Sequence, residues 1–124
     1  MRLDHIAYRV QDRHETARTI SRMFGYEIGT EFDIQFDDGS KAECIAMTPP
    51  EKNNAIGRIV EIPWSVHSAG VGLPVEHHLA PEIFISDGTS QSIVGSWVES
   101  RAGVGGVHHM AYQVKNIEET VKEW

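Results

Sequence analysis

Hydrophobic and polar residues alternate over residues 3–10 and then change to helical spacing. The alternation predicts a β-strand with one apolar face, formed by Ile6, Tyr8 and Val10. Asp12, with Glu15 three residues further on, has the spacing of a helix-capping box, and Gly25 is a natural helix end. Between these signals the apolar residues recur every three or four positions. The pattern therefore predicts a strand followed by a helix.

A hairpin is predicted next. Residues 26–36 and 41–47 are rich in apolar and β-branched residues, and the Asp38 and Gly39 between them are typical of a tight turn. Residues 82–86 form a short apolar run that ends before a second Asp-Gly pair, and we expect a further strand there. The predicted order of elements up to this point is β-α-β-β-β.

The segment over residues 48–80 lacks this periodicity. Pro, Gly and Asn residues interrupt it throughout, and a loop of this length within a small domain is usually a lid or an insertion. Residues 87–106 carry a short amphipathic pattern and end in a glycine-rich run, which predicts a linking helix.

The chain then repeats its opening motif. Residues 107–120 align with residues 3–16 without a gap, and six of the fourteen positions are identical. The identical pairs are His5/His109, Ala7/Ala111, Tyr8/Tyr112, Val10/Val114, Glu15/Glu119 and Thr16/Thr120. An internal repeat of this kind indicates a duplicated structural unit.

Together these elements predict an α+β fold in a single domain over residues 1–124. Residues 1–86 form a first β-α-β-β-β unit that carries the insertion at 48–80, residues 87–106 link the units, and residues 107–124 begin a second unit. The second copy stops after its strand and part of its helix, so we expect a truncated second unit.

Composition and charge narrow the classes of function. Eleven basic and eighteen acidic residues give a net charge of −7, which disfavours nucleic acids and anionic membranes because both require a basic surface. Cys44 is the single cysteine and forms no internal disulfide, which is typical of a reducing cytoplasm. We find no signal peptide and no apolar run long enough to span a membrane, so we expect a cytoplasmic protein.

Strand alternation gives the repeated histidines a common orientation. His5 and His109 each share a strand face with an alanine two residues later, opposite the large apolar side chains. If the repeated strands face each other, the two imidazoles converge, and imidazole is the commonest nitrogen ligand of divalent first-row metals. The alternative is that each histidine is a half-buried polar residue of the sheet.

Two carboxylates within predicted strands are candidates to complete such a site. Glu82 lies in an otherwise apolar strand, where an unpaired charge is costly, so it is the candidate third metal ligand. Glu43 lies in the second strand of the hairpin and is the candidate general base. For both residues the alternative is a charge that faces solvent.

Four segments of the chain carry a resemblance to a known superfamily. They are residues 3–8 (LDHIAY), 82–85 (EIFI), 92–98 (SIVGSWV) and 106–112 (GVHHMAY). In motif and order they resemble the vicinal oxygen chelate superfamily, which includes glyoxalases, bleomycin-resistance proteins and dioxygenases. Within it they are most similar to the methylmalonyl-CoA epimerases. The resemblance does not extend to residues 48–80.

The resemblance implies a fold and a chemistry. Members of the superfamily pair β-α-β-β-β units around a divalent metal ion such as Co, Mn, Zn, Ni or Fe. By position, His5, Glu82 and His109 would be metal ligands, Glu43 would be a catalytic carboxylate, and His108 would only neighbour the site. A fourth ligand of the family, a glutamate on the last strand of the second unit, has no counterpart in this sequence. The implied reaction inverts the α-carbon of an acyl-CoA through a metal-stabilised enolate.

Two other interpretations of the same resemblance stay open. One is a module of a 4-hydroxyphenylpyruvate-dioxygenase-like or extradiol dioxygenase, with iron and oxygen as cofactor and co-substrate. The other is a binding protein of the bleomycin-resistance type, which holds a small molecule without catalysis. In all three cases a unit and a fraction leaves sheet edges uncovered, so we expect a homodimer, with strand exchange as one of its forms.

Overall fold

The computed structural model describes residues 2–50 and 80–124. Their elements are β1 (Arg2–Arg9), α1 (Arg13–Phe24), β2 (Glu27–Gln35), β3 (Lys41–Thr48), β4 (Glu82–Asp87), α4 (Ile93–Glu99), β5 (Gly106–Gln113) and α5 (Ile117–Glu123). The predicted insertion lies almost entirely outside the described residues. The order of the first unit, β-α-β-β-β, is the predicted one.

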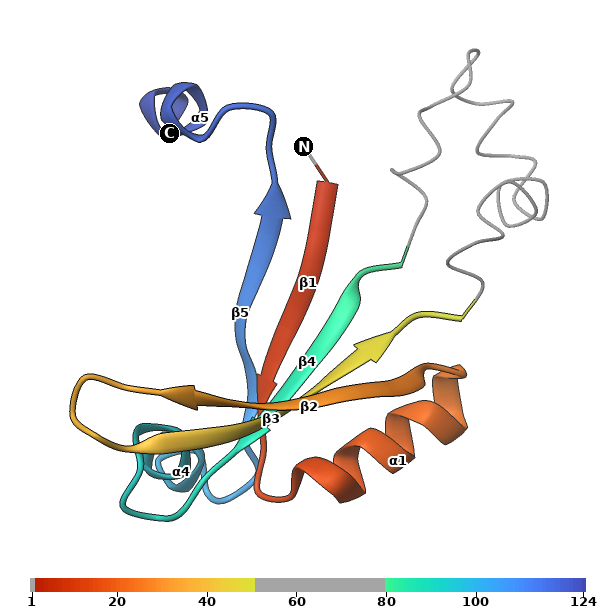
Figure 1. Ribbon diagram of the computed structural model, residues 1–124, viewed down its shortest axis with the longest axis vertical. Coiled ribbons are helices and arrows are strands. Elements are labelled where there is room, and N and C mark those ends of the chain that lie inside the picture. Colours follow the sequence, from red (N-terminus) through yellow and green to blue (C-terminus); the bar gives the residue numbers. More distant parts are fainter. Residues whose placement is uncertain (1, 51–79) are drawn as a thin grey trace.

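The five strands form one mixed sheet in the order β2-β3-β4-β1-β5 (Figure 1). β4 runs parallel to β1, and the remaining neighbours are antiparallel. The first strand of the second copy, β5, therefore pairs directly with β1, the first strand of the first copy. As a result the two repeated His-x-Ala segments lie on adjacent strands.

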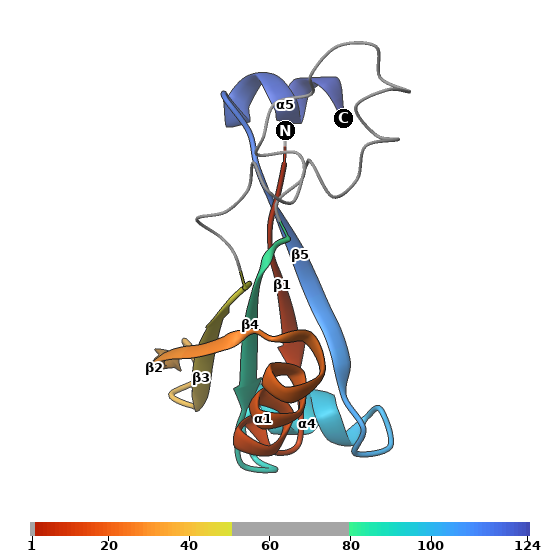
Figure 2. The ribbon, with the colours of Figure 1, turned by 90° about the vertical axis from the view of Figure 1, so that its right-hand side faces the viewer.

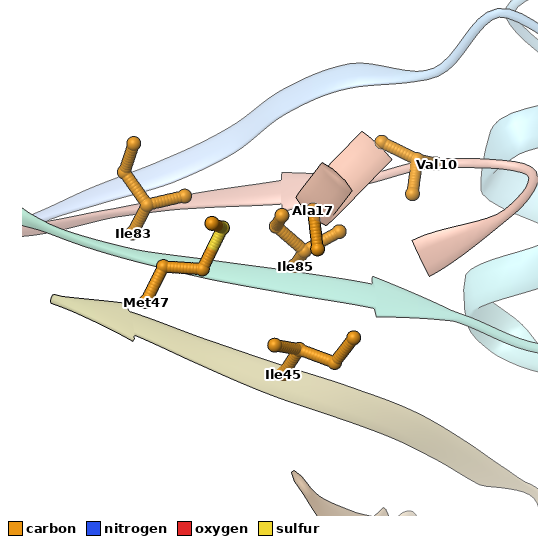
Figure 3. Packing of buried hydrophobic residues seen from close by; sticks show 6 residues of the cluster. All are labelled: Val10, Ala17, Ile45, Met47, Ile83 and Ile85. Carbon is orange, nitrogen blue, oxygen red and sulfur yellow. The ribbon is translucent and has the colours of Figure 1, made fainter. Parts of the chain in front are cut away.

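The helix α1 covers one face of the sheet (Figure 2). The main hydrophobic core lies beneath it. Every second residue of β1, β3 and β4 points to this face, as the alternation in the sequence predicts. Figure 3 shows the buried cluster, which is Val10, Ala17, Ile45, Met47, Ile83 and Ile85. Ile45, Met47 and Ile85 are at most 1% exposed, so the part of this face beneath α1 is closely packed.

Capping residues place the two equivalent helices after the two equivalent strands. The Asp12 side chain accepts a hydrogen bond of 3.0 Å from the Glu15 backbone N–H at the start of α1. Asn116 accepts one of 3.1 Å from the Glu119 N–H at the start of α5. Each contact satisfies a backbone donor that would otherwise lack a partner. The predicted helix starts are confirmed in both copies.

The helix α4 lies at the other face of the sheet, where it contacts β1, β3 and β4. Ser92 begins it by accepting a 3.0 Å hydrogen bond from the Gly95 backbone N–H, and Val94 packs on Ala42 and Cys44. Among the helices of the described residues, none is long and apolar enough to cross a membrane. The face beside α4 is less completely filled than the face beneath α1, and the candidate site lies there.

Candidate functional site

A cavity of about 360 Å³ opens on the face of the sheet opposite α1. All five strands and α4 contribute to it. Its lining residues are His5, Ala7, Arg9, Phe32, Ile34, Phe36, Ala42, Cys44, Phe84, Ser86, Val94, His108 and His109. Small residues on β1 and β3 leave the central space, and aromatic rings on β2 and β4 give it an apolar wall.

The two repeated histidines meet in this cavity. The ring centroids of His5 and His109 are 5.5 Å apart, with the rings nearly perpendicular. His5 Nδ1 lies 2.9 Å from the carboxylate of Asp4, and the ring also packs on Phe84 at 4.4 Å. A neutral His5 that donates its Nδ1–H to Asp4 keeps the lone pair of Nε2 for a ligand, the arrangement that orients metal-binding histidines.

His108 also lines the cavity, which strand alternation alone did not predict. The register of β5 against β1 shifts between the pairs Ala7/His109 and Tyr8/Val107, so one residue of β5 is extra at this point. Both neighbouring imidazoles then reach the same space, with their Nδ1 atoms 2.9 Å apart. One ring donates this hydrogen bond and the other accepts it.

The electrostatics of the cavity favour the neutral form of His108 and His109. Burial, together with the charge of His5 and then of Arg9, lowers the pKa of His109. Burial, followed by Arg9, His109 and Arg101, lowers the pKa of His108. Because only neutral imidazole can bind a metal ion, both shifts widen the pH range in which these side chains are competent ligands.

Glu82 lies next to His5 in the sheet. The two residues are register partners in the parallel pair of β1 and β4, so their side chains emerge on the same face. Glu82 does not line the cavity itself. Within residues 2–50 and 80–124, no group of three or more His, Cys, Asp or Glu side chains could hold a metal ion. The described residues thus bring together two of the three predicted ligands.

Glu43 lies on the opposite face, and the expectation that it faces the histidines needs correction. It shares a strand face with Ile45 and Met47, beneath α1. Its carboxylate is 2.8 Å from the guanidinium of Arg13 on that helix. The adjacent residues, Ala42 and Cys44, are the ones that reach the cavity. A general base at Glu43 would therefore be separated from the cavity by the sheet.

Arg9 is the charged cavity residue that the sequence reasoning missed. It follows His5 by four residues, so it emerges on the same face of β1. The alternation that singled out His5 and Ala7 contained this signal, since positions 5, 7 and 9 share one face. Its guanidinium lies 5.7 Å from the ring centroid of Trp97 on α4.

Cys44 is 2% exposed at the cavity wall. Burial raises the pKa of its thiol to about 11, and the carboxylates of Asp33 and Asp87 act in the same direction. A raised pKa means less thiolate at a given pH, and the thiolate is the nucleophile. We expect iodoacetamide at pH 8 to modify the native protein roughly 100-fold more slowly than the urea-unfolded protein, whose thiol pKa is about 8.5. Equal rates in the two states would contradict the buried, neutral thiol.

Comparison with known proteins bears on the fold. No protein-family model matches the sequence, and no curated protein matches it either. A solved methylmalonyl-CoA epimerase superposes on 99% of this chain with a TM-score of 0.61 at 21% identity. The fold of this chain is that of the methylmalonyl-CoA epimerases. The predicted vicinal oxygen chelate architecture, a glyoxalase-like β-α-β-β-β unit, is thereby confirmed.

Further epimerase structures support the same assignment of the fold. The enzyme from Mycobacterium tuberculosis superposes on 98% of this chain with a TM-score of 0.58 at 14% identity. The Streptomyces coelicolor enzyme in complex with 2-nitronate-propionyl-CoA superposes on 99% with a TM-score of 0.55 at 15% identity. This chain spans 68%, 60% and 69% of the lengths of the three matched chains.

The two histidines in the cavity and the carboxylate of Glu82 beside it are donors of the kind that bind divalent metals. Two imidazoles from adjacent strands approach each other, one of them is oriented by Asp4, and Glu82 is beside His5 on the same face. Nitrogen donors combined with a carboxylate suit first-row divalent ions. The described residues therefore offer two nitrogen donors of a suitable kind, His5 and His109, beside the cavity.

Proposed function

We propose that this chain is a metal-dependent isomerase of the vicinal oxygen chelate type, with an acyl-CoA thioester as its substrate class. His5, Glu82 and His109 would hold the divalent metal. When bound, that metal would supply the positive charge that stabilises an enolate oxygen. The observation that carries the proposal is the convergence of the two repeated histidines, at 5.5 Å between ring centroids, in one cavity of an epimerase-like fold.

The residues of the chain itself have distinct tasks in this proposal. Asp4 fixes the ring of His5 through their 2.9 Å contact. Phe32 and Phe84 pack edge to face at 6.2 Å and form the apolar wall against which the acyl group would lie. A wall of this kind excludes water and so strengthens electrostatic interactions at the reacting carbon.

Metal content and α-proton exchange together test the proposal. The protein purified without chelator should contain a divalent metal and should exchange the α-proton of methylmalonyl-CoA with deuterated water. Loss of a residue that merely orients a ligand costs about 10- to 100-fold in metal affinity. We therefore expect His5→Ala and His109→Ala to lose at least about 100-fold in affinity and to lose exchange.

His14→Ala is the matched control, because this histidine is 49% exposed and pairs with Glu31 on the α1 side of the sheet. It should keep wild-type metal affinity and exchange. Protein that contains no metal, and a His5→Ala variant that exchanges at the wild-type rate, would together refute the proposal. Oxygen uptake coupled to substrate loss would instead support the dioxygenase interpretation.

A second candidate function is ligand binding without catalysis, as in bleomycin-resistance proteins. The observation in its favour is that the described cavity wall contains no carboxylate that could remove a proton. Glu43, the expected base, is instead held by Arg13 behind the sheet. Tight binding of an acyl-CoA without any exchange of its α-proton would select this function over isomerisation.

Homodimer formation stays a prediction, and exposed apolar side chains on β5 and α5 support it. Met110 and Tyr112 on β5 are 54% and 51% exposed, and Ile117 and Val121 on α5 are 69% and 67% exposed. β5 is also an edge strand, whose unpaired backbone groups another strand can bind. A cytoplasmic location, where acyl-CoA thioesters are available, likewise stays part of the proposal.

A further inference from the structure

The cavity wall has a charge opposite to that of the protein. The whole chain carries a net charge of −7, whereas the part of the cavity lining that residues 2–50 and 80–124 form contains Arg9 and no aspartate or glutamate. The remaining polar groups of the lining are three imidazoles, one thiol and one hydroxyl. Arg9 is therefore the source of formal charge on this wall, in a space that is otherwise mainly apolar.

Arg9 differs from Arg13 on α1, whose side chain is 18% exposed. Arg13 lies within ion-pair distance of the carboxylates of Glu31, Glu43 and Asp87. Arg9 has no ion pair and no side-chain hydrogen bond within residues 2–50 and 80–124. A guanidinium has five N–H donors, so Arg9 can donate hydrogen bonds to a carboxylate that enters the cavity.

The position of Arg9 is fixed by packing rather than by counter-charge. Its guanidinium faces the indole of Trp97 at 5.7 Å, and Arg101 covers the same indole at 3.8 Å. Trp97 also contacts the ring of His108 at 5.4 Å. A planar guanidinium that lies against an aromatic ring keeps its N–H edge available for a carboxylate.

Arg9 lines the same cavity as the two neighbouring imidazoles of β5, and its charge contributes to lowering the pKa of both His108 and His109. The register partner of Arg9 on β5 is Gly106, which brings no side chain to this end of the cavity. A ligand that reaches the imidazoles therefore passes a cationic group that no carboxylate of the described chain neutralises.

We propose that Arg9 is a specificity-determining residue that binds the carboxylate of a small acidic ligand, whose apolar body lies against Phe32, Ile34 and Phe84. The ligand class is an aliphatic or acyl carboxylate of a size that a cavity of about 360 Å³ admits. This site uses none of the three proposed metal ligands, so it extends beyond the proposed function and can hold or fail independently of it.

Hexanoate and hexanamide test this site, because they have nearly the same shape and differ in charge. Each is titrated by NMR into the protein in EDTA, which excludes any contribution from a bound metal. We expect hexanoate to bind about tenfold more tightly than hexanamide, since a charge-assisted hydrogen bond is worth more than a neutral one. Equal affinities for the acid and the amide would overturn the proposal, and this comparison requires no variant.

Substitution of Arg9 then assigns the preference to one side chain. Arg9→Gln should bind the acid and the amide equally, and Arg9→Lys should restore part of the preference. Arg101→Gln is the matched control, because Arg101 stacks on the same indole from outside the cavity lining. It should keep the full preference for hexanoate. A preference that survives in Arg9→Gln, or that disappears in Arg101→Gln, would overturn the assignment.

Discussion

Gly105→Ala is expected to destabilise the protein by about 2–5 kcal/mol. Gly105 has φ = +77°, which costs an L-residue roughly 1–2 kcal/mol. In addition, a Cβ at this position would overlap the carbonyl group of Arg9. Backbone atoms of a paired strand cannot move aside as a flexible side chain can, because Arg9 is held in register with Gly106. Overpacking against a fixed neighbour commonly adds another 1–3 kcal/mol.

Gly103→Ala separates these two contributions. Gly103 has almost the same backbone angle, φ = +75°, but an added Cβ there has no atom within 4 Å. It should cost roughly 1–2 kcal/mol, the contribution of the positive φ alone. Urea denaturation of both variants measures the difference. Equal losses of stability would show that β1 and β5 do not approach each other as closely at this point as the structure has it.

The approach of β5 to β1 matters for the candidate site, because these two strands carry His5, Arg9 and His109. Gly105 lies just before β5 begins, where the turn from α4 enters the sheet. A displacement of β5 at this end would change the separation of the two imidazoles and the space beside Arg9. We therefore expect any folded fraction of Gly105→Ala to lose the preference for hexanoate as well as stability.

The repeat made the arrangement of the histidines predictable from the sequence. The alignment of residues 3–16 with residues 107–120 paired Asp12 with Asn116 as helix caps, and both form the expected hydrogen bond. The same alignment placed His5 and His109 on equivalent strand faces. The direct pairing of β5 with β1 is a property of the tertiary structure. A duplicated unit nevertheless restricts where the second copy can lie.

The alternation of side chains along a strand could not predict two features, the face that carries Glu43 and the inward position of His108. Residues 42–47 of β3 are almost all apolar, so their sequence did not reveal which face carries Glu43. Packing of α1 over this strand decides that question, because Arg13 then meets the carboxylate. The inward position of His108 depends on the irregular register between β5 and β1. An extra residue shifts the alternation, and nothing in the local sequence marks it.

Arg13 organises the charged groups on the α1 side of the sheet. Its backbone N–H donates a 2.7 Å hydrogen bond to Asp87, and its guanidinium donates one of 3.0 Å to the same carboxylate. Burial by itself would lower the pKa of Arg13, but Asp87, Glu43 and Glu31 outweigh it and raise this pKa. Arg13 Nε lies 3.5 Å from a carboxylate oxygen of Glu31, which is within ion-pair distance. This contact does not have the geometry of a hydrogen bond, and the buried Nε–H has no hydrogen-bond partner within the described residues.

Arg13→Met is therefore expected to lower the free energy of unfolding by about 2–3 kcal/mol at pH 7. Removing one member of a buried ion pair costs about 3–5 kcal/mol, and the partial exposure of Glu31 and Glu43, 53% and 44%, reduces that cost. The loss arises mainly at Asp87, whose side chain is 14% exposed and would keep its charge without a cation.

Lys41→Met is the matched control for this loss, because Lys41 also approaches Glu43, at 3.8 Å, but is 47% exposed. Exposed pairs contribute about 0–1 kcal/mol, so this variant should retain nearly all of its stability. Urea denaturation at pH 7 compares the two variants. Equal stability of Arg13→Met and Lys41→Met would contradict this prediction. It would mean that Arg13 does not stabilise the carboxylates of Asp87 and Glu43, and that its ion pair does not hold Glu43 on the α1 face of the sheet.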